Sequence, residues 1–270
     1  MASRMLPRSL IGHVIRRGLR SSSISQAAAE KITIYGFPMS QPCRALLILC
    51  KSAKIPYDFV LVDALKGENR KPDFVKMNPA GLVPAIKQGD FVLGETAAIL
   101  QYLSEANKLQ DWYPSDLQLR AKVIAVLLDY LTLKFTYACI STYLCHQTNF
   151  WLHWHHSNSR SSTKDILVYH LFRKADSDEK IASGKKKLAR SLSLMEKTLT
   201  GTTYLVYDKP TIADLLILCE LDQHLPEAFG LFDFTPFPKI SAWMNRIKTE
   251  IPAYTEVFSP VIEVAQKMKK

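Results

Sequence analysis

The stretch from Tyr35 to Arg44 carries the residues whose types and spacing most clearly suggest chemistry. Residues 32–35 form a short β-type run, a loop follows, and Ser40 stands at the start of a helix-forming segment with Pro42 in its first turn. The free N–H groups and the dipole at a helix start favour negative charge, and a hydroxyl there can donate a hydrogen bond to a thiolate. Lowering a thiol pKa from about 8.5 to about 7 takes roughly 2 kcal/mol, within reach of one hydrogen bond plus the dipole. The alternative is that Ser40 simply caps the helix.

Two further features indicate which ligand could carry the thiolate that this serine would contact. Val83 and Pro84 precede a predicted strand, where a cis proline would expose the Val83 backbone to a peptide-like ligand. Glu95 and Thr96 open the next predicted helix, which provides an anion site at a helix N-terminus and a carboxylate for an ammonium group. The implied ligand has a carboxylate, an amine, a peptide backbone and a thiol, and glutathione fits this description.

Redox and metal chemistry are less favoured. Cys43 follows Ser40 at the spacing of a thioredoxin motif whose first cysteine is replaced, so dithiol exchange is not expected. The five cysteines show no zinc-type spacing, and their odd number argues against a disulfide scaffold. Four histidines gather at 146, 153, 155 and 156, but without the Cys/His pairs of a structural zinc site. We therefore expect no metal.

The elements that position these residues alternate between short strands and short helices. From residue 31 to about 107, the patterns predict the order β-α-β-α-β-β-α, with a second strand over 57–62 and a helix over 71–77. Strands over 83–86 and 91–93 flank a hairpin turn, and a further helix covers 96–106. The result is one α/β unit.

The remainder of the chain has helical patterns. Ser115 to Gln118 and Thr211 to Asp214 resemble capping boxes, and helices are expected after each and over 238–247. A last helix over 254–268 is expected to be kinked or divided at Pro260. The serine-rich segment 157–163 is predicted as an exposed loop.

Composition and charge limit the function further. The chain has 270 residues, 47% of them hydrophobic and 22% charged, which is typical of a globular protein. Half of the net charge of +10 lies in residues 1–29, which hold five arginines and no acid, so we expect no nucleic-acid partner. The apolar residues of this segment recur in helical register, which predicts a mitochondrial presequence and a location in the matrix or on the matrix face of the inner membrane. A basic amphipathic helix that stays attached is the alternative. No segment reaches the roughly 20 apolar residues of a membrane span.

The sequence closely resembles the theta-class glutathione transferases over about residues 31–265. The matching residues are Ser40-Gln41-Pro42-Cys43-Arg44-Ala45, Lys66-Gly67, Asn78-Pro79, Val83-Pro84-Ala85, Gly89-Asp90-Phe91, Glu95-Thr96, Trp112 to Gln118, and Thr211-Ile212-Ala213-Asp214-Leu215. The resemblance implies the GST fold, in which an α/β thioredoxin-like N-terminal domain (30–109) precedes an all-α helical C-terminal domain (110–270). It also implies a homodimer.

The resemblance assigns a role to each candidate site residue. Ser40 would activate the glutathione thiol as the catalytic residue, and a small electrophile would bind between the domains. The expected glutathione-binding residues are Gln41, Asn69, Val83, Pro84, Glu95 and Thr96, with Glu95 near the amine. Other transferase classes use a tyrosine at the end of the first strand, but aligned on Cys43 that tyrosine falls at Gly36, so Tyr35 points to the opposite face.

The departures from the family lie mainly on the electrophile side. Asn69 and Leu82 stand where theta enzymes place a His and a Lys, although Arg70 or Lys71 can substitute for them. Phe135 replaces an active-site Arg and opens an aromatic segment, residues 135–159, which has no Asp, Glu, Lys or Arg. This segment suits a substrate pocket, a protein interface or interhelical core.

Two functions remain. The first is a mitochondrial transferase that conjugates glutathione to electrophiles. The second is a catalytically weak GST-like subunit of a large mitochondrial complex, bound through the aromatic segment.

Overall fold

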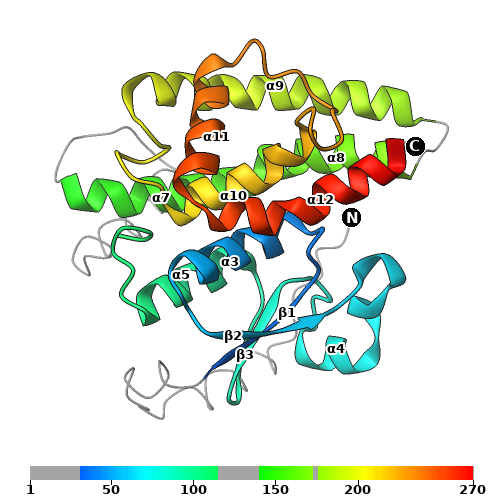
Figure 1. Cartoon of the computed structure of the whole chain (residues 1–270), viewed down its shortest axis with the longest axis vertical. Helices are drawn as coiled ribbons and strands as arrows, with labels where there is room; N and C mark the ends of the chain where they lie inside the picture. Colours follow the sequence, from blue (N-terminus) through cyan, green and yellow to red (C-terminus); the bar gives the residue numbers. More distant parts are fainter. Residues whose placement is uncertain (1–30, 115–139, 173–175, 270) are drawn as a thin grey trace, which may run out of the picture.

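The computed structural model describes residues 31–114, 140–172 and 176–269, which form an α/β domain and a helical domain packed on one side of it (Figure 1). The α/β domain contains a four-stranded sheet in the order β2-β1-β3-β4. Strand β1 (Ile32–Gly36) is parallel to β2 (Tyr57–Leu61) and antiparallel to β3 (Ala85–Gln88), which pairs with β4 (Phe91–Leu93). The helices of this domain are α3 (Gln41–Ser52), α4 (Pro72–Met77) and α5 (Thr96–Ala106), with short 3-10 turns at Ala64–Lys66 and Glu68–Arg70. The predicted β-α-β-α-β-β-α order is confirmed.

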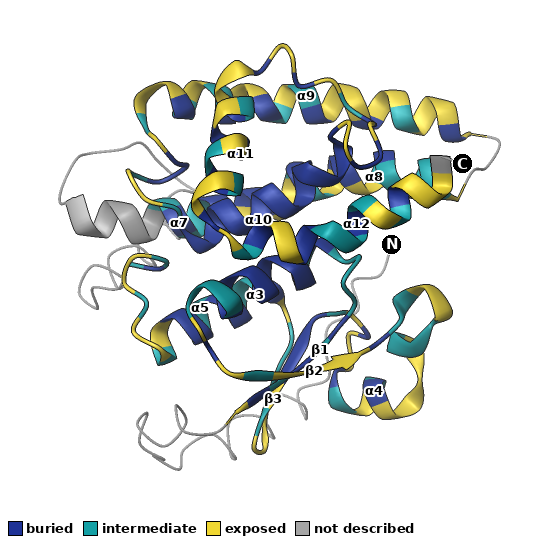
Figure 2. Ribbon diagram, in the orientation of Figure 1, coloured by how far each residue is buried: buried dark blue, intermediate teal, exposed yellow. Residues whose placement is uncertain are grey.

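The helical domain is built around one central helix. Helix α10 (Ile212–Leu221) is buried along its whole length, as expected of a helix that is apolar on every side (Figure 2). Around it lie α7 (Ile140–Ser157), α8 (Ser159–Leu171), α9 (Ser177–Gly201), α11 (Pro238–Glu250) and α12 (Ala253–Lys269), and a 3-10 turn (Asp222–His224) follows it. Within the described ranges, no helix is long and apolar enough to cross a membrane.

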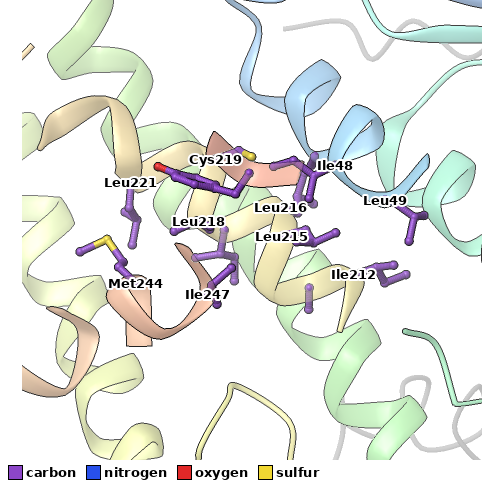
Figure 3. Packing of buried hydrophobic residues seen from close by; sticks show 14 of the residues in the cluster. Ile48, Leu49, Ile212, Leu215, Leu216, Leu218, Cys219, Leu221, Met244 and Ile247 are labelled. Carbon is purple, nitrogen blue, oxygen red and sulfur yellow. The ribbon is translucent and has the colours of Figure 1, made fainter. Parts of the chain in front are cut away.

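The two domains share one hydrophobic core. Helix α3 packs against α10 and α12, and Ile48 and Leu49 belong to the same buried cluster as Leu215 and Leu216 (Figure 3). A smaller cluster, Val62, Phe74 and Ala85, lies on the other side of the sheet beneath α4. Because α3 forms part of the shared core, its N-terminus is held at the boundary between the domains.

One local prediction is wrong, and one of the two forms of another is excluded. Residues 159–163 belong to helix α8 instead of an exposed loop, and Ser159, Ser162 and Thr163 are buried. Their hydroxyls donate to main-chain carbonyls of the preceding turn, as when Ser162 Oγ donates to Asn158 O at 3.0 Å. Pro260 lies inside α12, which continues through it, so the divided form of the prediction does not hold. The Ser259 hydroxyl donates at 3.0 Å to Glu256 O, the carbonyl that the proline leaves without its helical partner.

Candidate active site

Ser40 is the residue just before α3, at the end of the loop that follows β1. Its main-chain N–H donates to Phe37 O at 2.8 Å, and its carbonyl accepts from Arg44 N at 3.1 Å. The side chain makes no capping hydrogen bond to the helix, and the residue is partly exposed. The capping alternative is therefore not what the structure shows, and the hydroxyl stands at a helix N-terminus without a capping task.

Cys43, one turn into α3, is a buried thiol. Phe37 N donates to its Sγ at 3.4 Å. Burial raises the pKa of Cys43 to about 11, although Phe37 and the nearby Ser40 side chain favour its thiolate. It is therefore protonated at neutral pH, and the other described cysteines, Cys50 and Cys219, are also free and buried. This helix start offers no thiolate for dithiol exchange.

The register of β1 separates Tyr35 from Ser40. Ile32, Ile34 and Gly36 are buried on the α3 side of the sheet, and a Cβ on Gly36 would lie 3.4 Å from Cys43 Sγ. Tyr35 points the other way and packs against the small cluster beneath α4. The expectation that Tyr35 cannot activate the thiol is consistent with this geometry.

The loop before β3 contains the cis proline expected there from the sequence. The Val83–Pro84 bond is cis, Pro84 is buried and Val83 is partly buried. Two side-chain amides stabilise the loop by donating to its main-chain carbonyls. Asn78 Nδ2 donates to Leu82 O at 2.8 Å, and Asn69 Nδ2 donates to Gly81 O at 2.7 Å.

The side chains of Arg70 and Lys71, next to Asn69, also contact groups within the protein. Gly81 has a φ of +59°, in the left-handed region that favours glycine, and a Cβ there would lie 3.1 Å from Asn69 O. Arg70 reaches Ala80 O at 3.5 Å, and Lys71 pairs with Glu68 at 3.1 Å. The Asn69 side chain thus shapes the loop, and its amide nitrogen is already used within the protein.

Glu95 and Thr96 lie at the head of α5, as predicted. Glu95 has a φ of +65°, rare for a residue other than glycine, and its carboxylate accepts from Ala97 N at 3.5 Å. Thr96 is buried, whereas Glu95 is exposed and lies 3.2 Å from His156 Nε2 of α7. A carboxylate, a helix N-terminus and a histidine of the other domain therefore meet here.

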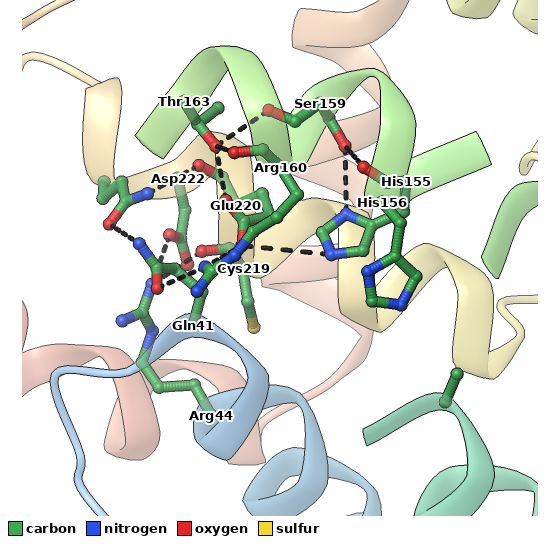
Figure 4. A network of polar contacts seen from close by, with 12 residues as sticks. Gln41, Arg44, His155, His156, Ser159, Arg160, Thr163, Cys219, Glu220 and Asp222 are labelled. Carbon is green, nitrogen blue, oxygen red and sulfur yellow. Dashed lines mark hydrogen bonds and ion pairs between the residues drawn. The ribbon is translucent and has the colours of Figure 1, made fainter. Parts of the chain in front are cut away.

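Gln41 has a different environment from the one expected of a ligand-binding residue. It is buried, its Nε2 donates to Gln223 Oε1 at 2.7 Å, and its Oε1 accepts from Arg160 Nη1 at 2.8 Å (Figure 4). Arg160 also pairs with Glu220 at 2.5 Å. The Gln41 side chain therefore ties the first turn of α3 to α8 and to the end of α10.

The network around Gln41 holds a buried charge. Burial opposes ionisation of Glu220, but the Arg160 guanidinium and a hydrogen bond from Thr163 keep its pKa below the usual range. His155 Nδ1 forms a hydrogen bond of 3.0 Å with Ser159 Oγ. Burial lowers the pKa of His155 to about 4, so its ring is neutral at neutral pH. Glu220 and Arg160 therefore form the ionic centre of the network.

Arg44 provides a second link between the domains. It pairs with buried Asp222 at 2.9 Å, donates to Cys219 O at 2.7 Å, and donates to Met39 O at 3.0 Å. Since Met39 immediately precedes Ser40, the guanidinium fixes the loop that carries the hydroxyl.

Residues 30–105 match the family described as Glutathione S-transferase, N-terminal domain, and residues 161–250 match Glutathione S-transferase, C-terminal domain. The chain belongs to the glutathione S-transferase family. It is 34% identical over 238 residues to glutathione S-transferase theta-3 of Mus musculus, covering 86% of this chain and 87% of that protein. It is 32% identical to glutathione S-transferase theta-1 of Homo sapiens, with the same two coverages. The predicted theta-class resemblance is confirmed.

Solved structures of glutathione transferases share the fold. Human glutathione transferase theta-2, in complex with glutathione, superimposes with a TM-score of 0.70 at 28% identity, covering 88% of this chain and 91% of that one. The apo form of human glutathione S-transferase T1-1 gives 0.69 at 26% identity, covering 87% and 91%. The predicted thioredoxin-like domain followed by a helical domain is thus the glutathione S-transferase fold.

Several predictions about this chain fall on residues outside the described ranges. These are the presequence (1–29), the first capping box (Ser115 to Gln118), and Phe135 with the first part of the aromatic segment. In the later part of that segment, Trp151 and Trp154 are buried, and Trp151 Nε1 donates to Leu205 O at 2.9 Å. These two tryptophans belong to the hydrophobic core of the helical domain. No group of three metal-ligating side chains occurs within the described parts of the chain.

The residues that sequence reasoning missed are Arg160, Glu220 and Gln223. Arg160 was hidden by the loop prediction for 157–163, although it is the first charged residue after the charge-free segment. Glu220 offered a clearer signal, because it is an acid within the apolar run of α10. An acid in such a position needs a buried partner.

Proposed function

We propose that the chain is a glutathione transferase in which Ser40 stabilises the thiolate of bound glutathione. The observation that carries the proposal is the Ser40 hydroxyl at the start of α3, with no capping task and with the residue partly exposed. In this proposal, the main chain at the cis Val83–Pro84 bond contacts the peptide backbone of glutathione. Glu95 and Thr96 contact its γ-glutamyl end.

In the proposed reaction, the thiol proton of glutathione passes to solvent and the Ser40 hydroxyl donates to the remaining thiolate. The sulfur then attacks an electrophilic carbon; a carbon–sulfur bond forms, and the leaving group departs with the electron pair of its bond. The helix N-terminus adds a favourable field for the sulfur anion. The electrophile is expected between the domains.

Replacing Ser40 with Ala tests the proposal in the full chain. Loss of roughly 2 kcal/mol of thiolate stabilisation predicts a fall in kcat/KM of about 30-fold and loss of the thiolate absorbance of bound glutathione at neutral pH. The matched control is Ser157→Ala, which alters an exposed serine at the end of α7. Turnover and absorbance that are unchanged in Ser40→Ala would contradict the assignment.

The second candidate is the GST-like subunit with weak catalysis. It is favoured by the side chains of Gln41 and Asn69, which are engaged within the protein. Size after mild detergent extraction separates the two functions. A homodimer of about twice 30.6 kDa, the state general among these transferases, supports the enzyme, whereas migration only with a large membrane complex supports the subunit.

We also propose that residues 1–29 direct the protein to mitochondria. Their arginine-rich, acid-free composition with helical apolar spacing supports this role. Residues 1–29 fused to a fluorescent protein should co-localise with mitochondria, and Arg16→Ser/Arg17→Ser should weaken that localisation. Diffuse fluorescence of the unaltered fusion would contradict the proposal.

A further inference from the structure

His156 contacts the carboxylate that we assign to the ammonium group of glutathione. Its Nε2 lies 3.2 Å from Glu95 Oε1, the same oxygen that accepts from Ala97 N at 3.5 Å. The pair joins α7 of the helical domain to the head of α5 in the α/β domain. The two side chains are 48% and 57% exposed, so a ligand can reach both of them.

A protonated imidazole and an ammonium group are both cations, and each would be placed against the same carboxylate. Their mutual repulsion makes simultaneous binding unfavourable. We propose that His156 competes with the ammonium group of glutathione for Glu95 and so sets the affinity for the γ-glutamyl end. The inference rests on the proposed function and adds to it a residue of the helical domain that determines ligand affinity.

The surroundings of His156 leave Glu95 as its ionic partner within the described residues. The ring of His155 lies 5.5 Å away, centroid to centroid, and is neutral at neutral pH because burial lowers its pKa to about 4. Arg160, on the following helix, is paired with Glu220 (Figure 4). Imidazole groups generally gain their charge between about pH 8 and pH 5. Competition is therefore strongest at the acidic end of this range.

Binding of S-methylglutathione to the full chain, measured by calorimetry at pH 6 and pH 8, tests the inference. This probe keeps the γ-glutamyl amine but has no thiol, so ionisation of sulfur does not enter the comparison. Since the Glu95–His156 pair is partly exposed, the wild-type protein should bind the probe about two- to five-fold more weakly at pH 6 than at pH 8. His156→Asn should bind with one affinity at both pH values, close to that of the wild type at pH 8.

His153→Asn is the matched control, because His153 is an exposed histidine on the same helix. It should retain the pH dependence of the wild type. The same probe without its α-amino group should bind the wild type with no such dependence, since it carries no cation to compete.

Three results would overturn the inference. His156→Asn with the same pH dependence as the wild type removes His156 as its cause. Weaker binding by His156→Asn at both pH values makes His156 a ligand of glutathione instead of a competitor. Absence of binding by every variant, the wild type included, overturns the proposed function together with this inference, whereas the first two results leave the proposed function intact.

Discussion

At the scale of single residues, two histidines of this protein differ in their surroundings. His156 is exposed beside a carboxylate, whereas His224, in the turn after α10, is fully buried. Neither ring nitrogen of His224 has a hydrogen-bond partner within the described residues, and burial lowers its pKa to about 4. His224 is therefore neutral in the folded protein at neutral pH, and in the unfolded chain it takes up a proton near pH 6.5.

This difference predicts how stability depends on pH. The folded-state pKa of His224 is depressed, so its contribution is fully present above about pH 6.5 and is lost as pH falls toward 4. Between pH 7.5 and pH 5 the loss from one such group is about 2 kcal/mol. At pH 7.5 the free energy of unfolding of His224→Leu in urea should be within about 1 kcal/mol of the wild-type value, because no hydrogen bond is broken. Between pH 7.5 and pH 5 the variant should lose about 2 kcal/mol less of this free energy than the wild type. Exposed His153→Asn should follow the wild type, and an identical acid loss in His224→Leu would contradict the account.

At the scale of elements, buried helix α10 depends on one carboxylate at its start. Asp214 accepts from Thr211 N at 2.9 Å in the predicted capping box, and from Leu205 N and Trp243 Nε1 at 2.9 Å each. It therefore joins the loop before α10, the helix itself and α11. A local sequence motif thus serves a long-range contact, which its spacing alone could not indicate.

Asp214→Ala should be far more destabilising than loss of an exposed cap. It leaves several buried donors without a partner, so the free energy of unfolding should fall by at least about 3 kcal/mol. Glu196→Ala is the comparison, because Glu196 caps α11 at its exposed start by accepting from Lys239 N and Ile240 N at 2.8 and 3.0 Å. That change should remove about 1 kcal/mol. Equal losses in urea unfolding would show that burial of the Asp214 donors does not matter.

The same contrast between local and distant contacts explains what the sequence could predict. The strand and helix order, Ser40 at the start of α3 and the head of α5 follow from short-range patterns, and the structure places them accordingly. The loop prediction for 157–163 failed because serine-rich composition is typical of loops, yet Thr163 is buried against Glu220, which lies 57 residues further along the chain. The family resemblance assigns Gln41 to the ligand, but its side-chain partners in the structure, Arg160 and Gln223, are 119 and 182 residues away.

At the scale of the whole molecule, two ion pairs near α3 lie in different surroundings. Arg160–Glu220 links α8 to α10 within the helical domain, its side chains are 34% and 0% exposed, and Arg160 also donates to Gln41 of α3. Lys51–Glu256 links the end of α3 to α12 at 2.8 Å, with side chains 32% and 68% exposed. Solvent screens the second pair more than the first, whose carboxylate is fully buried, so the first pair should have the larger coupling energy.

Double-mutant cycles on these pairs measure that difference directly. Arg160→Leu leaves the Glu220 carboxylate buried without its guanidinium, so the free energy of unfolding should fall by about 3 kcal/mol. Arg160→Leu/Glu220→Leu should recover much of that loss, because the uncompensated charge is gone, and this gives a large coupling energy. The matching cycle with Lys51→Met and Glu256→Gln should give less than about 1 kcal/mol. Similar coupling in the two cycles would mean that the buried pair is as well solvated as the exposed one.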